Sequence, residues 1–408
     1  HQEARRQRQM CIRDRFNTES CTIFALDANT GKHLWSWWLG DPLTTTPTIA
    51  GGKVYTTYPV VGGGAFQQFD GEQAYNNNSG HAVKQEPIDK TIKEEKNSGD
   101  KKDAKTLPRN PKATHALACF DLKTGKILWQ KWVDGDAMSA PIAVDKELYV
   151  TTFPGTVFKF HQDTGEILSA VRARATSAPT VVGNEVYFTC RSDKDGKVWE
   201  SNGRWGRESF SRNMAYNANQ AIYLDKTVQS KSKLAEQGKQ MDAGNGFGGG
   251  APAASGYKAA MDNIGQASVS TMQSFQGSRI LNFKGKNFNC MGNKLFCCDP
   301  VTGRVAWEKK IKGDIKKLGG FMAAPPVLAG DQILVATIQG DINIFDHKQG
   351  KLNKSYKTKA PVRFQPSVVD GRIYVGTQNG KVICIDTKDK SLTGWAMWGG
   401  NARHSSAK

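Results

Sequence analysis

FALDANTGKHLW (residues 24–35), ACFDLKTGKILW (118–129) and FCCDPVTGRVAW (296–307) repeat one pattern, in which a short apolar run ends at Asp and continues as x-x-Thr-Gly, a basic residue and Trp. Weaker copies are FKFHQDTGEILS (158–169), NIFDHKQGKLNK (343–354) and ICIDTKDKSLTGW (383–395). A pattern that returns along the whole chain indicates a repeat architecture.

The spacing of the copies defines the size of the repeated unit. Gly125 and Gly165 lie 40 residues apart, as do Pro326 and Pro366, and about 40 residues form one four-stranded propeller blade. Within a unit, segments such as RIYVGT (372–377) alternate with the two-residue period of a strand. The sequence therefore predicts an all-β chain, a β-propeller of four-stranded blades, with seven blades and eight as the alternative.

The Asp-x-x-Thr-Gly segment is expected to close a hairpin, because Asp and Thr bond to turn backbone and Gly accepts a positive φ. The Trp eight positions after the Asp is expected to fill the wedge between neighbouring blades. The repeat positions to which we assign these structural roles are Asp27, Gly31, Trp35, Asp121, Gly125, Trp129, Gly165, Asp299, Gly303, Trp307, Gly350 and Asp386.

These motifs resemble those of the PQQ-like (pyrroloquinoline-quinone-type) β-propeller repeat proteins, over most of residues 20 to 400. That family includes quinoprotein alcohol dehydrogenases and also cofactor-free members, such as a scaffold lipoprotein of bacterial outer-membrane assembly. The resemblance implies the fold, whereas function has to be argued from a site.

The ends of the chain and two insertions stand apart from the repeat. Residues 1–15 contain RRQRQMCIRDR (5–15), which reads as a translated sequencing adapter at the edge of a metagenomic fragment, or alternatively as a basic disordered leader. We assign residues 16–400 to one propeller domain and 401–408 to a tail. An insertion at about 62–114 is polar and charged, and a second at about 193–276 contains aromatic and Arg residues.

The second insertion is the candidate partner-binding segment, since aromatic and Arg residues dominate protein interfaces. The candidate residues are Trp199, Arg204, Trp205, Arg207 and Arg212. A carbohydrate surface with Trp199 and Trp205 as stacking rings is a further alternative.

The net charge of +18 favours a protein partner or another acidic surface. Nucleic acid is an unlikely partner because the lysines form no stripe interleaved with aromatics. No apolar stretch reaches the 18 or so residues of a membrane helix.

The chemical motifs are sparse. The seven histidines form no close pair, there is no Cys-x-x-Cys, and no acid/base pair can be assigned, so we predict no catalytic and no metal-binding residue. Cys297–Cys298 resembles the adjacent cysteines of quinoprotein dehydrogenases, but ordinary strand filling is the preferred interpretation. We therefore expect a non-catalytic binding or scaffold propeller of a periplasmic or secreted assembly, without a cofactor. The alternative is a quinoprotein-type oxidoreductase with PQQ and Ca²⁺.

Overall fold

The computed structural model describes residues 13–17, 22–38, 47–59, 67–69, 115–194, 197–208, 212–215, 221–223, 279–313, 322–362 and 364–393. All regular elements in these ranges are β-strands, and they pair in antiparallel fashion into seven sheets. No helix that could cross a membrane occurs in the same ranges. The predicted all-β fold is confirmed.

The first three sheets in chain order are as follows. Sheet 1 has the order β1 (Arg13–Asn17), β2 (Thr22–Asp27), β3 (His33–Trp38) and β6 (Gln67–Phe69). Sheet 2 has the order β4 (Thr48–Ala50), β5 (Lys53–Pro59), β7 (His115–Asp121) and β8 (Ile127–Val133). Sheet 3 consists of β9 (Ile142–Val144), β10 (Glu147–Thr151), β11 (Thr156–His161) and β12 (Ile167–Arg172).

The remaining four sheets keep the same strand order. Sheet 4 contains β13 (Thr180–Val182), β14 (Glu185–Lys194), β15 (Lys197–Gly206) and β16 (Arg212–Ala215), with β17 (Ala221–Tyr223) also paired to β15. Sheet 5 contains β18 (Leu281–Phe283), β19 (Lys286–Met291), β20 (Lys294–Cys298) and β21 (Val305–Lys310). Sheet 6 contains β22 (Val327–Ala329), β23 (Gln332–Ala336), β24 (Asp341–Asp346) and β25 (Leu352–Lys357), and sheet 7 contains β26 (Ser367–Val369), β27 (Arg372–Gly376) and β28 (Val382–Asp386).

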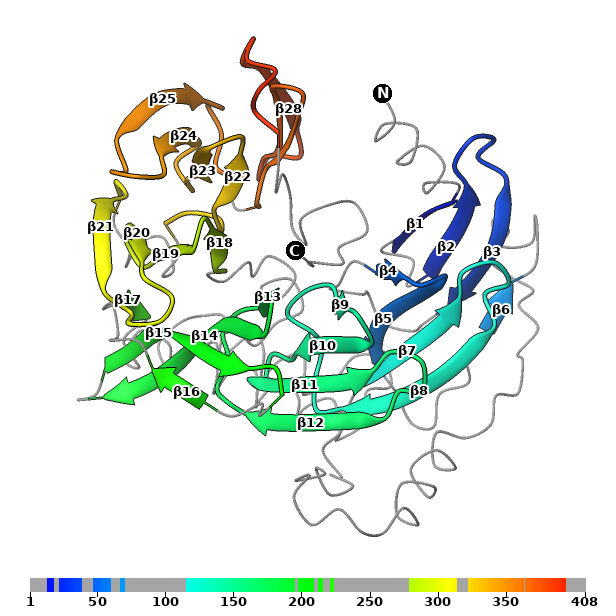
Figure 1. Ribbon diagram of the computed structural model, residues 1–408. Coiled ribbons are helices and arrows are strands. Elements are labelled where there is room, and N and C mark those ends of the chain that lie inside the picture. Colours follow the sequence, from blue (N-terminus) through cyan, green and yellow to red (C-terminus); the bar gives the residue numbers. More distant parts are fainter. Residues whose placement is uncertain are drawn as a thin grey trace, which may run out of the picture.

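The sheets succeed one another around a common centre in the order of the sequence (Figure 1). The short strands β4, β9, β13, β18 and β22 lie innermost, and β4 contacts β9 while β18 contacts both β13 and β22. Hydroxyl groups join these inner strands, since Thr48 donates to the Pro141 carbonyl at 2.5 Å and Thr180 donates to the Ile280 carbonyl at 2.7 Å. This radial arrangement of sheets is that of a β-propeller.

The hydrophobic core is divided among the spaces between successive sheets, because each sheet buries one face against the next. Ile23 and Ala25 of sheet 1 pack against Val54 and Phe120 of sheet 2, for example. Comparable clusters join sheets 2 and 3, 3 and 4, 5 and 6, and 6 and 7. A side-chain period of two lets the apolar residues of one strand face one neighbouring sheet.

The repeated Asp-x-x-Thr-Gly segment forms the turn between the third and fourth strands. In sheet 2, Asp121 Oδ1 accepts bonds from the Thr124 amide at 2.8 Å and the Thr124 hydroxyl at 2.8 Å. Gly125 then donates its amide to the Asp121 carbonyl at 2.9 Å with a φ of 70°. Asp299 holds its turn in sheet 5 in the same way. In sheet 1 the corresponding turn of Asp27 connects β2 and β3, the second and third strands. The motif thus fixes where the strand after the turn begins.

The tryptophans of this motif connect each sheet to the following one. Trp129 of sheet 2 donates its Nε1–H to the Gln162 carbonyl of sheet 3 at 3.0 Å, and its ring covers Gly165. A Cβ at Gly165 would lie 2.6 Å from the ring. Such tryptophan–glycine joints link sheets 1 and 2, 2 and 3, and 5 and 6, through the pairs Trp35–Gly125, Trp129–Gly165 and Trp307–Gly350.

Some predicted boundaries differ from the observed strands. Residues 197–206 were assigned to the second insertion, yet they form β15, the third strand of sheet 4. In the first insertion, β6 pairs with β3, whereas residues 62–66 and 70–114 lie outside the described residues. Arg13–Asn17 pairs with β2, while residues 1–12 and the tail 401–408 lie outside the described residues. The number of blades stays a prediction.

Candidate interaction site

The candidate partner-binding residues lie in and just after an unusually long hairpin of sheet 4. β14 and β15 each contain ten residues, whereas β10 and β11 contain five and six. Residues 191–194 and 197–200 pair with each other beyond the part of the sheet held by β13 and β16. β17, from within the second insertion, pairs with residues 198–200. We call residues 191–194, 197–200 and β17 the projecting hairpin.

Trp199 is part of the projecting hairpin, where its backbone lies opposite Ser192 on one side and Ile222 on the other. Arg212 is in β16, opposite Trp205 in the register of the sheet. The two residues are thus on neighbouring strands, but only Trp199 lies in the part of the hairpin that extends past the sheet.

Trp205 belongs to the core instead. Its side chain is 3% exposed and meets the Phe188 ring edge to face, with centroids 4.5 Å apart. It packs in the cluster shared by sheets 3 and 4, together with Val186 and Tyr149. The burial of this ring argues against its use as a contact or stacking surface, and corrects the expectation that Trp205 faces a partner.

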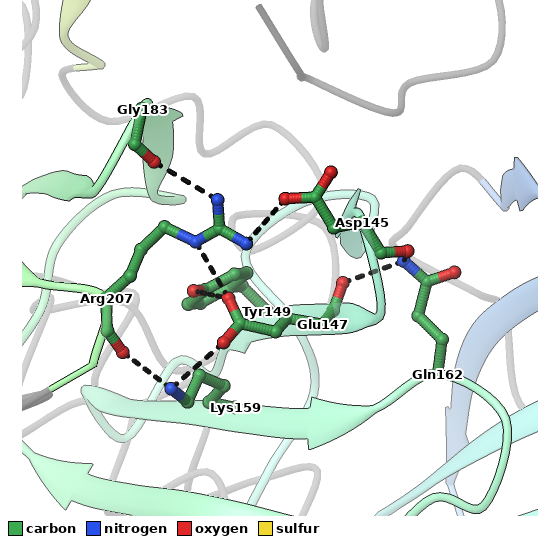
Figure 2. Close-up of polar contacts among 7 residues, drawn as sticks. All are labelled: Asp145, Glu147, Tyr149, Lys159, Gln162, Gly183 and Arg207. Atoms are coloured by element: carbon green, nitrogen blue, oxygen red, sulfur yellow. Dashed lines mark hydrogen bonds and ion pairs between the residues drawn. The ribbon is translucent and has the colours of Figure 1, made fainter.

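Arg204 and Arg207 are held by ion pairs within the chain. Arg204 of β15 binds Glu185 of β14 with both ends of its guanidinium, through Nε at 2.8 Å and the terminal nitrogen at 2.5 Å. Arg207, directly after β15, reaches across to sheet 3 (Figure 2). Its Nε donates to Glu147 Oε2 at 2.9 Å and a terminal nitrogen donates to Asp145 Oδ2 at 2.9 Å.

Glu147 is the centre of this network. It accepts bonds from Arg207, from the Tyr149 hydroxyl at 2.5 Å and from Lys159 Nζ at 3.2 Å, and the same Nζ donates to the Arg207 carbonyl at 2.6 Å. Burial opposes ionisation of Glu147, but these hydrogen bonds and the charge of Lys159 outweigh it and hold the pKa below its ordinary value. The carboxylate therefore stays charged and firmly bound at neutral pH.

The network takes the place of a tryptophan–glycine joint. Ser169 stands in sheet 3 where Trp129 stands in sheet 2, so sheet 3 has no motif tryptophan to set against sheet 4. Arg207 joins these two sheets through Asp145 and Glu147, and it also donates to the Gly183 carbonyl at 3.1 Å. Because Arg207 directly follows β15, the network fixes the end of β15 against sheet 3.

A buried amide cluster between sheets 4 and 5 was not foreseen. Asn289 donates to Asn202 Oδ1 at 3.0 Å, and Asn202 Nδ2 lies 3.9 Å from Cys298 Sγ. All three side chains are at most 3% exposed. The sequence around Asn202 and Asn289 did not indicate that these side chains are buried, because each one is buried by a partner from another sheet.

The adjacent cysteines do not fit a quinone site. Cys297 packs toward sheet 6 with Leu295 and Phe288, whereas Cys298 packs on the opposite face with Met291. Both thiols are free and buried, and burial raises their pKa values to about 11 and about 12. Strand filling, the preferred interpretation of this pair, agrees with these positions. Within the described ranges no group of three or more His, Cys, Asp or Glu side chains is placed to hold a metal ion.

Comparison with known proteins places these features in a family. A family model described as "Outer membrane protein assembly factor BamB" matches residues 112–256 and 291–398. The chain is 22% identical over 379 residues to the outer membrane protein assembly factor BamB of Shewanella oneidensis, covering 86% of this chain and 88% of that protein. The predicted resemblance to PQQ-like repeat proteins is confirmed.

A solved structure shows the same fold. The crystal structure of BamB from Moraxella catarrhalis matches with a TM-score of 0.51 at 14% identity, covering 91% of this chain and 79% of that chain. The likeness supports the propeller arrangement of the sheets and, at this identity, the fold alone.

Proposed function

The chain belongs to the family of the outer membrane protein assembly factor BamB, and on this premise we propose that it is a non-catalytic scaffold of an outer-membrane assembly machinery. The proposed location is the periplasm, where such a scaffold would meet its partners. The proposal assigns the propeller a binding role, with protein as the partner and no cofactor.

The observation that carries this proposal is the projecting hairpin. Arg207 and Glu147 tie the end of β15 opposite the projecting hairpin to sheet 3, while β14 and β15 extend past the sheet at their other end and join β17 from the second insertion. A strand pair that is anchored at one end and extends past the sheet at the other is suited to presenting a contact surface. We propose Trp199 as a contact residue at the tip, with Arg204 and Arg207 positioning the hairpin rather than binding the partner.

The net charge of +18 gives the partner its expected character. A basic chain associates faster and more tightly with acidic surfaces, and this attraction weakens as salt screens it. We therefore expect the partner surface to be acidic and its binding to be released by salt.

The test is recovery of partners from the source organism with the tagged chain at low salt, followed by mass spectrometry. Outer-membrane assembly proteins should co-elute, and Trp199→Ala should lower their recovery. Leu128→Ala is the control, because Leu128 is an apolar residue that is 44% exposed and lies on β8, in a different sheet from the projecting hairpin. If both variants recover the same amount of these proteins, Trp199 does not contact the partner.

The non-catalytic part of the proposal has its own test. The chain is incubated with PQQ and Ca²⁺ and assayed for alcohol oxidation with an artificial electron acceptor. Dehydrogenase activity together with stoichiometric quinone binding would overturn the scaffold assignment in favour of a quinoprotein oxidoreductase.

A further inference from the structure

β28 lies at the end of the series of sheets and differs from the third strands of the other sheets. In sheets 3 and 6, for example, the third strands β11 and β24 pair with the fourth strands β12 and β25. Among the described strands, β28 pairs with β27 alone. One side of β28 is therefore an open sheet edge within the described part of the chain.

The residues that follow β28 leave this edge. Thr387 donates its amide to the Gly371 carbonyl at 2.9 Å, and Gly371 donates in turn to the Leu392 carbonyl at 3.2 Å. The Gly330 amide then binds the Thr393 carbonyl. Gly371 and Gly330 are in the turns that connect the first and second strands of sheets 7 and 6, so residues 387–393 run toward the inner strands. The continuation of β28 is directed away from the position of a fourth strand.

The hydrogen-bond pattern identifies the backbone groups that face the open side. At one end of the β27–β28 pair the Thr377 amide donates to the Lys381 carbonyl at 2.8 Å, and at the other end the Thr387 amide donates to the Gly371 carbonyl. Residues opposite each other in an antiparallel pair alternate between bonded and non-bonded, so Ile383 and Ile385 bond to β27. The amide and carbonyl groups of Val382, Cys384 and Asp386 therefore point outward.

The side chains of the same residues leave the edge accessible. Val382 is 79% exposed and Cys384 is also exposed. β28 has the sequence VICID, with neither proline nor an inward-pointing lysine, the residues that usually protect a sheet edge from pairing. An accessible edge of β-branched residues is a template for an added strand.

At the other end of the series of sheets, one turn glycine has no tryptophan over it among the described residues. Gly31 holds the same turn position in sheet 1 as Gly125 in sheet 2, with the same φ of 70°. Trp35 covers Gly125, but no atom lies within 4 Å of a Cβ placed at Gly31. The fourth strand of a preceding sheet would supply that ring, and sheet 7 has no such strand among the described residues.

We propose that the outer edge of β28 is a docking site for an extended β-strand of an acidic partner protein, which pairs with Val382, Cys384 and Asp386. Lys381 and Lys388 are exposed at the two ends of the edge, and Lys388 also binds Asp386 at 2.8 Å. With a chain charge of +18, pairing of two copies of this chain is opposed by like charge. The inference rests on the proposed function and specifies the chemistry of one partner contact.

The test uses a short fluorescent peptide of alternating glutamate and valine, and the variants Cys384→Ser and Cys384→Pro. Because the Cys384 amide points outward, proline there removes one donor of the edge and leaves the pairing with β27 intact. The serine variant should bind the peptide, and the proline variant should bind it about tenfold more weakly or not at all. Equal unfolding midpoints of the two variants would show that the sheet is unchanged.

Two further measurements do not depend on how the proline variant folds. A peptide with the same sequence but N-methylated at every residue has no amide hydrogen to donate from either edge and should not bind Cys384→Ser. Hydrogen exchange should show fast amides at Val382, Cys384 and Asp386 in the free chain and slow ones with the peptide. Binding of the methylated peptide, no binding of either peptide, or slow amides in the free chain would each overturn the proposal.

The same variants separate this inference from the proposed function. If Cys384→Pro recovers outer-membrane assembly proteins as well as Cys384→Ser does, the scaffold function stands and the edge is not the contact. If the peptide binds the edge but neither variant recovers such proteins, the strand-docking site stands and the proposed function fails.

Discussion

Gly125→Ala is expected to destabilise the propeller more than Gly31→Ala, although the two glycines occupy the same turn position. Both have a φ of 70° and both donate their amide to the Asp four residues earlier. A Cβ at Gly125 would lie 2.6 Å from Cδ2 of the Trp35 ring, whereas one at Gly31 meets nothing within 4 Å. The comparison isolates the contact between sheets 1 and 2.

The magnitudes follow from two separate costs. Left-handed backbone costs a residue with a Cβ about 1–2 kcal/mol, and this applies equally to both variants. Forcing the added methyl against the buried Trp35 ring costs about 1–3 kcal/mol more, since Trp35 is only 2% exposed and is fixed by its bond to the Leu122 carbonyl at 3.1 Å. Gly31→Ala should therefore lose about 1–2 kcal/mol and Gly125→Ala about 2–5 kcal/mol.

The assay is urea unfolding followed by circular dichroism, with the free energy of unfolding taken from linear extrapolation. A double variant, Trp35→Ala with Gly125→Ala, tests the cause directly. Trp35→Ala alone should cost about 3–5 kcal/mol, and adding Gly125→Ala should then cost no more than Gly31→Ala does. The steric part of the loss should thus vanish when the ring is removed.

Equal losses for the two glycine variants would refute this reasoning. So would an undiminished effect of Gly125→Ala in the absence of the Trp35 ring, because the cost would then come from the turn alone.

Three other outcomes are expected. Arg207→Met should lower the free energy of unfolding by about 1.5–3 kcal/mol, whereas Lys284→Met, which breaks an exposed pair, should change it by less than about 1 kcal/mol in the same urea titration. Because the pKa of Glu147 is lowered in the folded chain, its contribution is present above the ordinary pKa of about 4.3 and is lost as pH falls through the folded value. The stability difference between the parent and Glu147→Gln should therefore shrink on acidification, and a constant difference would contradict this. In a chain whose cysteines before residue 22 are serine, Cys384 alone should react with a thiol reagent in the folded state, since the other described cysteines are buried, and rapid reaction of Cys298 would contradict its placement.

The sequence predicted the repeat well because its signals are local. An Asp, a Thr and a Gly within five residues define a turn through their own hydrogen bonds, and the observed bonds to Asp121 are those expected for this motif. The strands before it follow from alternation alone. Fold class and turn positions could therefore be derived without knowledge of any distant contact.

The candidate site was harder to predict because its residues are used over long sequence distances. Arg207 meets Glu147 sixty residues away, and Trp205 lies on β15, a strand that the local pattern does not reveal. β15 contains Gly203 and polar residues such as Asn202, which obscured its strand character. One signal was available: a hairpin partner has to follow β14 directly, as β11 follows β10 in the preceding repeat.

The joints between sheets also differ in the conditions that loosen them. Aromatic rings hold sheets 1 to 3 together, and this apolar contact is insensitive to ionic strength. Sheets 3 and 4 depend in addition on charges around Glu147, whose partly exposed members are screened by salt and titrated by acid. The seam between sheets 3 and 4 can consequently be loosened by salt or acid without melting the blades on either side, and local opening in hydrogen exchange would increase there under those conditions.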